Sequence, residues 1–372
     1  MTTFRAWLLL VALGFMGGPF ANADCECGYS LNSTVFTDLI ESDFTLPQNI
    51  TGNTDWVLQE WQVDKEASKG PYGRKTQMQN VVSNPSVQHN ISSKGVNGDP
   101  AGLELFVRKL EDNGEHIGVA EADTRRTDML YGTFRAGIKT TSINGTCGAF
   151  FWYLNDTQEI DIEFLSSQIT PTSSSINLVL HSPLTQERGG DAKSTPTYKV
   201  ISLPFAIDQE FHEYRFDWQP DRVSFYVDSK WMADITDNRY IPQSPGKIIL
   251  SHWSNGNPLW SGGPPEVDAK MTVSYVKGYF NSSLPSRQED YKDRCKSRRG
   301  PNAICPIPNQ SGPPKVGTVH FFSQQPGTDK TPNQTVYAKE PSTSLGSGLT
   351  AGRDCWVLVC SVLLASFMSL VL

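Results

Sequence analysis

Apolar and polar residues alternate with a period of two along much of this 372-residue chain. Such alternation is typical of β-strands that bury one face and expose the other. It is clear in Tyr131–Lys139 and on both sides of Gln219-Pro220-Asp221-Arg222, a turn sequence that predicts a hairpin over 213–228. Further strands are expected at Leu103–Lys109, Ile176–His181, Ile248–Trp253 and Met271–Phe280. Because no convincing amphipathic helix or internal repeat accompanies them, we predict an all-β fold, an antiparallel β-sandwich (jelly roll) of two packed sheets.

One globular domain is expected over residues 24–283, which contain nearly all the aromatic residues and the alternating segments. A length of about 260 residues is normal for a single β-sandwich domain. Residues 284–346 are instead rich in Pro, Ser, Thr, Gly and charged residues. This composition predicts a disordered stalk.

Both ends of the chain resemble processing signals. The apolar run Ala6–Phe15 and the small residues Ala21-Asn22-Ala23 predict a cleaved secretory signal over 1–23, because the run is too short for a membrane anchor. Residues 347–372 end in the apolar stretch Cys355–Leu372 and predict a GPI-anchor signal that is removed. A single tail-anchoring helix is the alternative. We therefore expect a secreted protein at the cell surface, lipid-anchored to the plasma membrane or the cell wall.

Sequons and cysteines agree with this secretory route. Eight N-x-S/T sequons lie at Asn32, Asn49, Asn90, Asn144, Asn155, Asn281, Asn309 and Asn333. Five cysteines lie between the predicted signals, at Cys25, Cys27, Cys147, Cys295 and Cys305. An odd number leaves one cysteine without an intrachain partner. A loop closed by Cys295 and Cys305 is one possible pairing, and the spacing alone does not decide the connectivity.

The net charge of −7 argues against a nucleic-acid partner, which would require a basic surface. The six histidines are scattered and form no zinc motif. No nucleophile elbow, phosphate-binding loop or dinucleotide fingerprint is present. We therefore expect no cofactor and no metal, and no calcium ligand set can be recognised. The protein is expected to be a monomer.

The segment 159–164 carries the most informative pattern. Its acidic residues Glu159, Asp161 and Glu163 share one strand face, and Ile160, Ile162 and Phe164 share the other. A solvated acidic strand is the simpler explanation. However, acidic residues form strands poorly, and like charges on one face repel each other.

Glycoside hydrolysis offers a functional explanation for this spacing, because it needs two carboxyl groups on either side of one bond. Retaining enzymes hold these groups about 5 Å apart. Residues i and i+4 of a strand are about 13 Å apart at the backbone, and two long Glu side chains can close most of that gap. Asp161 lies between Glu159 and Glu163, where crowding would raise the pKa of one acid and keep its proton available.

Glu159-Ile160-Asp161-Ile162-Glu163 resembles the E-x-D-x-E signature of glycoside hydrolase family 16, which includes β-glucanases and fungal cell-wall transglycosidases. Other segments resemble the family in order and spacing across most of residues 24–283. They are 131–139, 148–152, 211–228 and 271–276. The resemblance implies a concanavalin-like jelly roll with a substrate cleft over one sheet. It also implies that Glu159 is the nucleophile, Glu163 the acid/base, and Asp161 the residue that orients and tunes Glu159.

Sugar rings stack on aromatic side chains, and Trp152, Trp253 and Trp260 are the candidate substrate-binding residues. Ordinary packing is the alternative for each of them. Trp56, Trp61, Trp218 and Trp231 are expected in the core. His181 and His252 could line the cleft, although a structural role is the preferred reading.

Two functions remain open from the sequence. The favoured one is a retaining glycosidase or transglycosidase that cleaves internal β-1,3 or β-1,3-1,4 linkages of a cell-wall β-glucan. The other is a non-catalytic carbohydrate-binding protein of the same fold, which the intact Glu159, Asp161 and Glu163 disfavour. The carboxylates do not distinguish hydrolysis from transfer.

Overall fold

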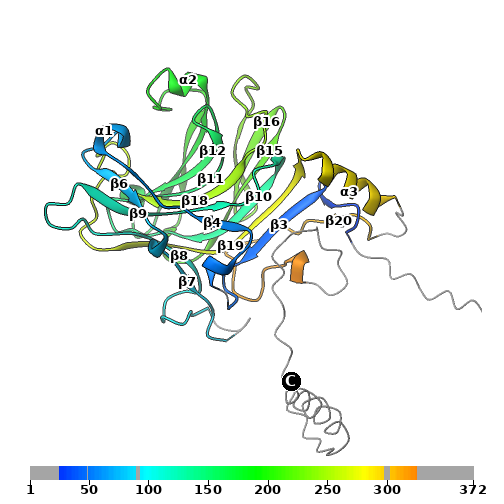
Figure 1. The fold of residues 1–372 in the computed structure, drawn as a ribbon, viewed down its shortest axis with the longest axis horizontal. Helices are drawn as coiled ribbons and strands as arrows, with labels where there is room; N and C mark the ends of the chain where they lie inside the picture. Colours follow the sequence, from blue (N-terminus) through cyan, green and yellow to red (C-terminus); the bar gives the residue numbers. More distant parts are fainter. Residues whose placement is uncertain (1–24, 48, 89–92, 297–301, 325–372) are drawn as a thin grey trace, which may run out of the picture. The chain divides into compact units, whose positions relative to one another are not determined.

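The computed structural model describes residues 25–47, 49–88, 93–296 and 302–324. The predicted signal peptide, the predicted GPI signal and the sequons at Asn90 and Asn333 lie outside these residues. Strands dominate the described part, and two large antiparallel sheets form its two layers (Figure 1). Within the described ranges no helix is both long and apolar enough to cross a bilayer.

The first sheet, here called the cleft sheet, has nine strands and carries the predicted catalytic segment. In spatial order it contains β14 (Tyr198–Leu203), β13 (Ser174–His181), β12 (Gln158–Leu165), β11 (Cys147–Asn155), β18 (Lys247–Trp253), β9 (His116–Thr124), β6 (Gly73–Thr76) and β5 (Trp61–Val63), with β4 (Trp56–Leu58) also paired to β9. All of these pairs are antiparallel except β6 with β9.

The second sheet, here called the back sheet, has eight strands. In spatial order it contains β17 (Lys230–Ile235), β16 (Arg222–Val227), β15 (His212–Gln219), β10 (Met129–Lys139), β19 (Ala269–Ser282), β8 (Gly102–Val107) and β7 (Val81–Asn84), with β3 (Asp38–Asp43) also paired to β19. The predicted hairpin is β15–β16, in which Gln219 pairs with Arg222. The prediction of an all-β antiparallel sandwich is confirmed.

Short elements complete the fold. A small third sheet contains β2 (Thr34–Phe36), β1 (Tyr29–Leu31) and β20 (Cys305–Pro306). The α-helices are α1 (Lys65–Ser68), α2 (Pro183–Gln186) and α3 (Pro285–Cys295), and the 3₁₀ turns are η1 (Ile50–Gly52), η2 (Met78–Asn80), η3 (Ser166–Gln168) and η4 (Phe322–Gln324). In Figure 1, α1 and α2 stand on the same side of the molecule, and both contribute residues to the cleft described below.

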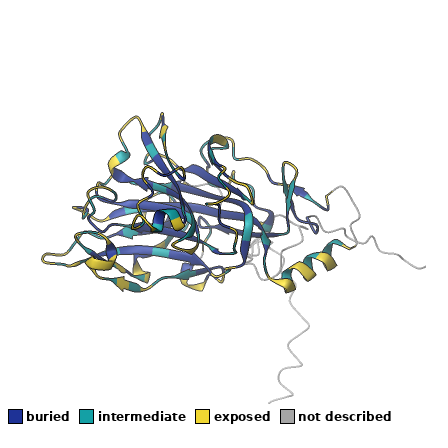
Figure 2. Ribbon diagram, turned by 90° about the horizontal axis from the view of Figure 1, so that it is seen from above, coloured by how far each residue is buried: buried dark blue, intermediate teal, exposed yellow. Residues whose placement is uncertain are grey.

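The main core lies between the two sheets and follows from the alternation (Figure 2). Ile160, Ile162 and Phe164 of β12 are buried there, as the pattern predicts. Aromatic pairs cross between the layers: the rings of Phe164 and Tyr214 are 4.5 Å apart. Burial of each such side chain stabilises the fold by about 1.5–3 kcal/mol. Because the apolar side chains of β12 are held in the core, its acidic side chains must point away from the core.

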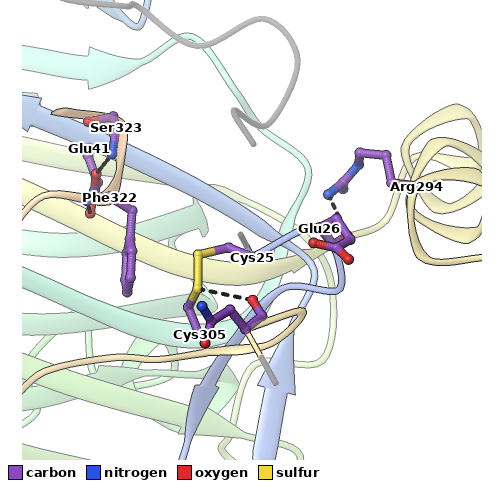
Figure 3. The surroundings of a disulfide bond; sticks show 8 residues. Cys25, Glu26, Glu41, Arg294, Cys305, Phe322 and Ser323 are labelled. Carbon is purple, nitrogen blue, oxygen red and sulfur yellow. Dashed lines mark hydrogen bonds between the residues drawn. A yellow bond between two sulfur atoms is a disulfide. The ribbon is translucent and has the colours of Figure 1, made fainter. Parts of the chain in front are cut away.

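Residues after Ser283 are folded against the domain. Disulfides join Cys25 to Cys305, shown in Figure 3, and Cys27 to Cys295, whereas Cys147 is a free cysteine. The possible loop between Cys295 and Cys305 is therefore not formed. The structure also differs from the prediction of a stalk beginning at Leu284, because α3 ends at the disulfide-bonded Cys295 and the chain after the disulfide-bonded Cys305 is hydrogen-bonded to the back sheet.

Buried charges explain why this polar segment folds. Glu41 on β3 accepts hydrogen bonds from the backbone N–H groups of Phe322 (3.2 Å) and Ser323 (2.8 Å), and Figure 3 shows this contact. Lys277 on β19 donates to the carbonyl of His320, and Arg135 on β10 donates to that of Pro308, each at 2.8 Å. Buried ionic groups require such partners. Residues 305–324 thus cover the outer face of the back sheet.

Candidate active site

A cleft of about 590 Å³ lies over the cleft sheet and contains all three predicted catalytic carboxylates. Glu159, Asp161 and Glu163 point into it from alternate positions of β12. Asp161 is buried, whereas the two glutamates are half-buried. The strand therefore presents two long acids that reach the cleft, with a shorter acid held between them.

Burial raises the pKa of each of these acids. The pKa of Glu163 rises to about 7, mainly because burial disfavours its charged form. The pKa of Asp161 is raised well above its ordinary value, first by burial and then by the charges of Glu159 and Glu163. The pKa of Glu159 is also raised by burial, although a hydrogen bond with Asp161 opposes this effect. The cluster therefore retains a proton at neutral pH, as general acid catalysis requires.

His181 on β13 closes one side of this acidic cluster. Its Nε2 lies 3.9 Å from Oδ2 of Asp161, and its Nδ1 lies 3.3 Å from Oγ1 of Thr185. Burial lowers the pKa of His181 to about 4, so the ring is neutral at neutral pH and its contact with Asp161 is not an ion pair. One ligand atom each of Glu159, Asp161 and His181 lie within 4.8 Å of one another. His181 thus belongs to the site.

His252 has the structural role that the sequence favoured for both histidines. It is buried, and its Nδ1 lies 2.8 Å from the carbonyl oxygen of Leu105. Burial lowers its pKa to about 4. It points away from the cleft residues, because its neighbours Ser251 and Trp253 occupy the cleft face of β18.

Trp253 and Trp260 line the cleft at the Glu163 end. Trp260 donates its Nε1–H to Oε1 of Glu163 at 3.3 Å, and the ammonium of Lys193 lies 5.3 Å from its ring centre. The guanidinium of Arg74 lies 5.2 Å from the ring centre of Trp253. Both tryptophans are half-buried, so each keeps a surface towards the cleft.

Trp152 is not in the cleft, and its prediction as a substrate-binding residue is wrong. It is fully buried between the sheets, where its ring centre lies 4.4 Å from that of Trp218 and its Nε1–H bonds the carbonyl of Met129 at 3.3 Å. The period of two explains the error: Trp152 pairs with Ile160, whereas Phe151 pairs with Asp161 and lines the cleft. Among the other tryptophans, Trp56 and Trp218 are buried as expected, but Trp231 is 59% exposed.

Glu121 on β9 is a cleft residue that the sequence analysis missed. Its Oε1 accepts a hydrogen bond from Nε1 of Trp61 at 3.1 Å, and burial raises its pKa to about 7. The sequence does contain a pattern that could have indicated this residue. Glu121 and Asp123 alternate with Ala120 and Ala122, just as the acids of β12 alternate with isoleucines. No spacing rule connects two separate strands, so only the pairing of the sheet shows that these acids face one cleft.

Comparisons with known proteins identify the family of the chain. Residues 80–277, more than half of the chain, match the family described as Glycosyl hydrolases family 16. A β-glucanase of Paenibacillus macerans is 36% identical over 148 residues, which cover 38% of this chain and 56% of that protein. The Crh-like protein 3 of Botryotinia fuckeliana is 28% identical over 261 residues, which cover 66% of this chain and 51% of that protein.

The matches thus span about half the length of these curated relatives. Among solved structures, a Bacillus licheniformis β-glucanase aligns with a TM-score of 0.49 and 20% identity, covering 65% of this chain and 97% of that one. The match over residues 80–277 contains β12 and most strands of both sheets. This chain belongs to glycosyl hydrolases family 16.

Proposed function

We propose that this protein is a retaining glycosidase or transglycosidase that acts on internal linkages of a β-glucan. The observation that carries the proposal is the placement of Glu159 and Glu163 on one face of β12, in one cleft, with Asp161 between them. The β-glucanases among the relatives support a glucan substrate.

In the first step, the carboxylate of Glu159 attacks the anomeric carbon, and a glycosyl–carboxylate bond forms as the glycosidic bond breaks. Glu163 gives its proton to the departing oxygen, which leaves as a hydroxyl group. Burial raises the pKa values of all three clustered carboxyl groups, so a proton remains in the cluster near neutral pH and is available to Glu163. Asp161 bonds Glu159 and holds its carboxylate in place during the attack.

In the second step, Glu163 removes a proton from the incoming acceptor, which attacks the anomeric carbon and releases Glu159. Water gives hydrolysis, and a sugar hydroxyl gives transfer. The apolar surfaces of Trp253 and Trp260 suit the stacking of an acceptor or donor ring, and Lys193 and Arg74 hold these tryptophans in place.

A surface location is part of the same proposal. The predicted secretory signal and lipid anchor would hold the domain outside the cell, where a wall glucan is the available polymer. The disulfides Cys25–Cys305 and Cys27–Cys295 suit an oxidising compartment.

Substitution of the nucleophile tests the proposal. Wild type and Glu159→Gln would be assayed side by side on laminarin and lichenan, with a fluorescent oligosaccharide acceptor added in parallel. We expect product release from the wild type to exceed that of the variant by about 10³-fold or more, because the covalent step is lost. Longer labelled chains would identify transfer. Equal activity of the two proteins would contradict the nucleophile role of Glu159, and no activity in either protein would favour a carbohydrate-binding protein.

A further inference from the structure

Cys147 is the one free cysteine among the residues that the structure describes, and it touches a carboxylate of the site. It is fully buried at the start of β11. Cys147 pairs with Leu165, whereas Ala149 pairs with Glu163, so Cys147 and Glu163 are diagonal neighbours on the cleft face. The thiol Sγ lies 3.3 Å from Oε1 of Glu163, closer than the 3.6 Å to its other acceptor, the carbonyl of Gly148.

A second donor meets the same oxygen. The indole Nε1–H of Trp260 also lies 3.3 Å from Oε1 of Glu163. An oxygen that accepts two hydrogen bonds acts as the carbonyl oxygen of a protonated carboxyl group, because a proton on that oxygen would face both donors. The proton of Glu163 is thereby directed to Oε2.

We propose that Cys147 is a positioning residue whose thiol, together with the Trp260 indole, fixes Oε1 of Glu163 as the accepting oxygen and leaves Oε2 to carry the acid/base proton. This inference rests on the acid/base role of Glu163 in the proposed function. Cys147 does not face the sugar itself, because it is fully buried. It acts only through Glu163.

The thiol remains a donor over the working pH range. Burial raises the pKa of Cys147 well above its ordinary value, and the neighbouring charges of Glu163 and Asp161 raise it further. The other ionisable groups that interact with Glu163 are Glu159 and Asp161 on its own strand and Tyr198 on β14. The charge of Arg74 on β6 interacts with Cys147, and Lys193 lies above the Trp260 ring. Asn177 on β13, the direct pairing partner of Glu163, is neutral. Within the described part of the chain, the side chains that donate hydrogen bonds to Glu163 are thus Cys147 and Trp260.

Loss of the thiol should change the protonation of Glu163 rather than substrate binding. A donor to Oε1 stabilises the carboxylate that forms when Oε2 releases its proton. In Cys147→Ala we expect the basic limb of the kcat profile to move upward by about 0.5–1 pH unit, and kcat to fall roughly 3- to 30-fold with KM nearly unchanged. Cys147→Ser keeps an O–H donor and should restore most of the wild-type profile.

A vibrational measurement tests the contact without relying on activity. The infrared difference spectrum of wild type minus Cys147→Ser isolates the S–H stretching band of Cys147. We expect this band at the low frequency of a thiol bonded to a carboxyl group. The spectra are recorded at a pH well above the pKa of Glu163, where its side chain is a carboxylate. Under that condition the band should move to higher frequency in Glu163→Gln, because a neutral amide is a weaker acceptor than a carboxylate.

Ile138→Val is the matched control, because it removes one buried methylene from the back sheet and leaves the cleft untouched. It should reproduce any loss of thermal stability in Cys147→Ala without moving the pH profile. An unchanged profile in Cys147→Ala, or an S–H band that Glu163→Gln does not move, would overturn the inference. Full activity of Glu163→Gln would instead overturn the proposed function, whatever the infrared band shows.

Discussion

Glu121 and Glu163 lie in one cross-strand row of the cleft sheet, with only Ser251 and Ala149 between them. Three strand spacings separate the two acids, about 14 Å at the backbone. All four residues line the cleft, so two small side chains form a floor between two carboxyl groups. Under the proposed function, this row would define where a glucan chain lies relative to Glu163.

The row predicts a binding role for Glu121. At a pH above the pKa of Glu121, about 7, the substitution Glu121→Gln turns a hydrogen bond from a sugar hydroxyl to a charged acceptor into one to a neutral acceptor. We expect KM for soluble β-glucan to rise about 3- to 10-fold, with a smaller change in kcat, in steady-state assays. Glu210→Gln, at an exposed position outside the cleft, is the control and should behave like wild type. An effect on kcat alone would show that Glu121 is not a binding residue.

The two tryptophans Trp152 and Trp260 should respond in opposite ways to truncation. Trp152→Ala leaves a cavity between the sheets and should lower the free energy of unfolding by about 3–5 kcal/mol, measured by chemical denaturation. Trp260 lies in the cleft, so Trp260→Ala should change the free energy of unfolding by less than about 1 kcal/mol. The same substitution should lower kcat/KM at least tenfold. A stable, inactive Trp152→Ala would restore that residue as a substrate contact.

The boundary of the folded domain can be tested by truncation. A chain that ends at Ser283 loses both disulfides and the backbone groups that pair with Glu41 and Lys277. We expect it to be unfolded or insoluble, since each disulfide contributes about 2–4 kcal/mol and the buried charges become unpaired. A chain that ends at Gln324 should keep a cooperative thermal transition. Equal stability of the two truncations would support a stalk that begins at Leu284.

The acidic cluster should make stability depend on pH. Because the pKa of Glu163 is raised to about 7 from 4.5, the folded state holds a proton that the unfolded state releases, and stability falls as pH rises through this window. The substitution Glu163→Gln removes the ionisable group, and with it the free-energy cost of burying a charged carboxylate at high pH. At pH 8 we expect the variant to be more stable than wild type by roughly 1 kcal/mol after solvent screening, with no gain at pH 4. Thermal melts at both pH values check this, and a gain at pH 4 alone would contradict it.

The alternation of apolar and polar residues alone predicted most of the sandwich and the cleft face of β12. When every second residue must be buried, a strand can be placed in the sheet with only one of its two faces towards the core. It failed where the contacts are made by residues distant in the sequence. Glu121 and Cys147 join the site only through the pairing of β9, β18, β11 and β12. The folding of residues 302–324 depends on disulfides and buried charges that a Pro- and Ser-rich composition conceals.

The direct test of the central proposal is to trap the glycosyl-enzyme. A 2-deoxy-2-fluoro glucan oligosaccharide with an activated leaving group slows release of the intermediate and lets it accumulate. Peptide mass spectrometry of the treated wild type should place the sugar on Glu159, and Glu159→Gln should remain unlabelled. A sugar attached to Glu163, or an active protein that forms no adduct and inverts the anomeric configuration, would contradict a retaining mechanism through Glu159.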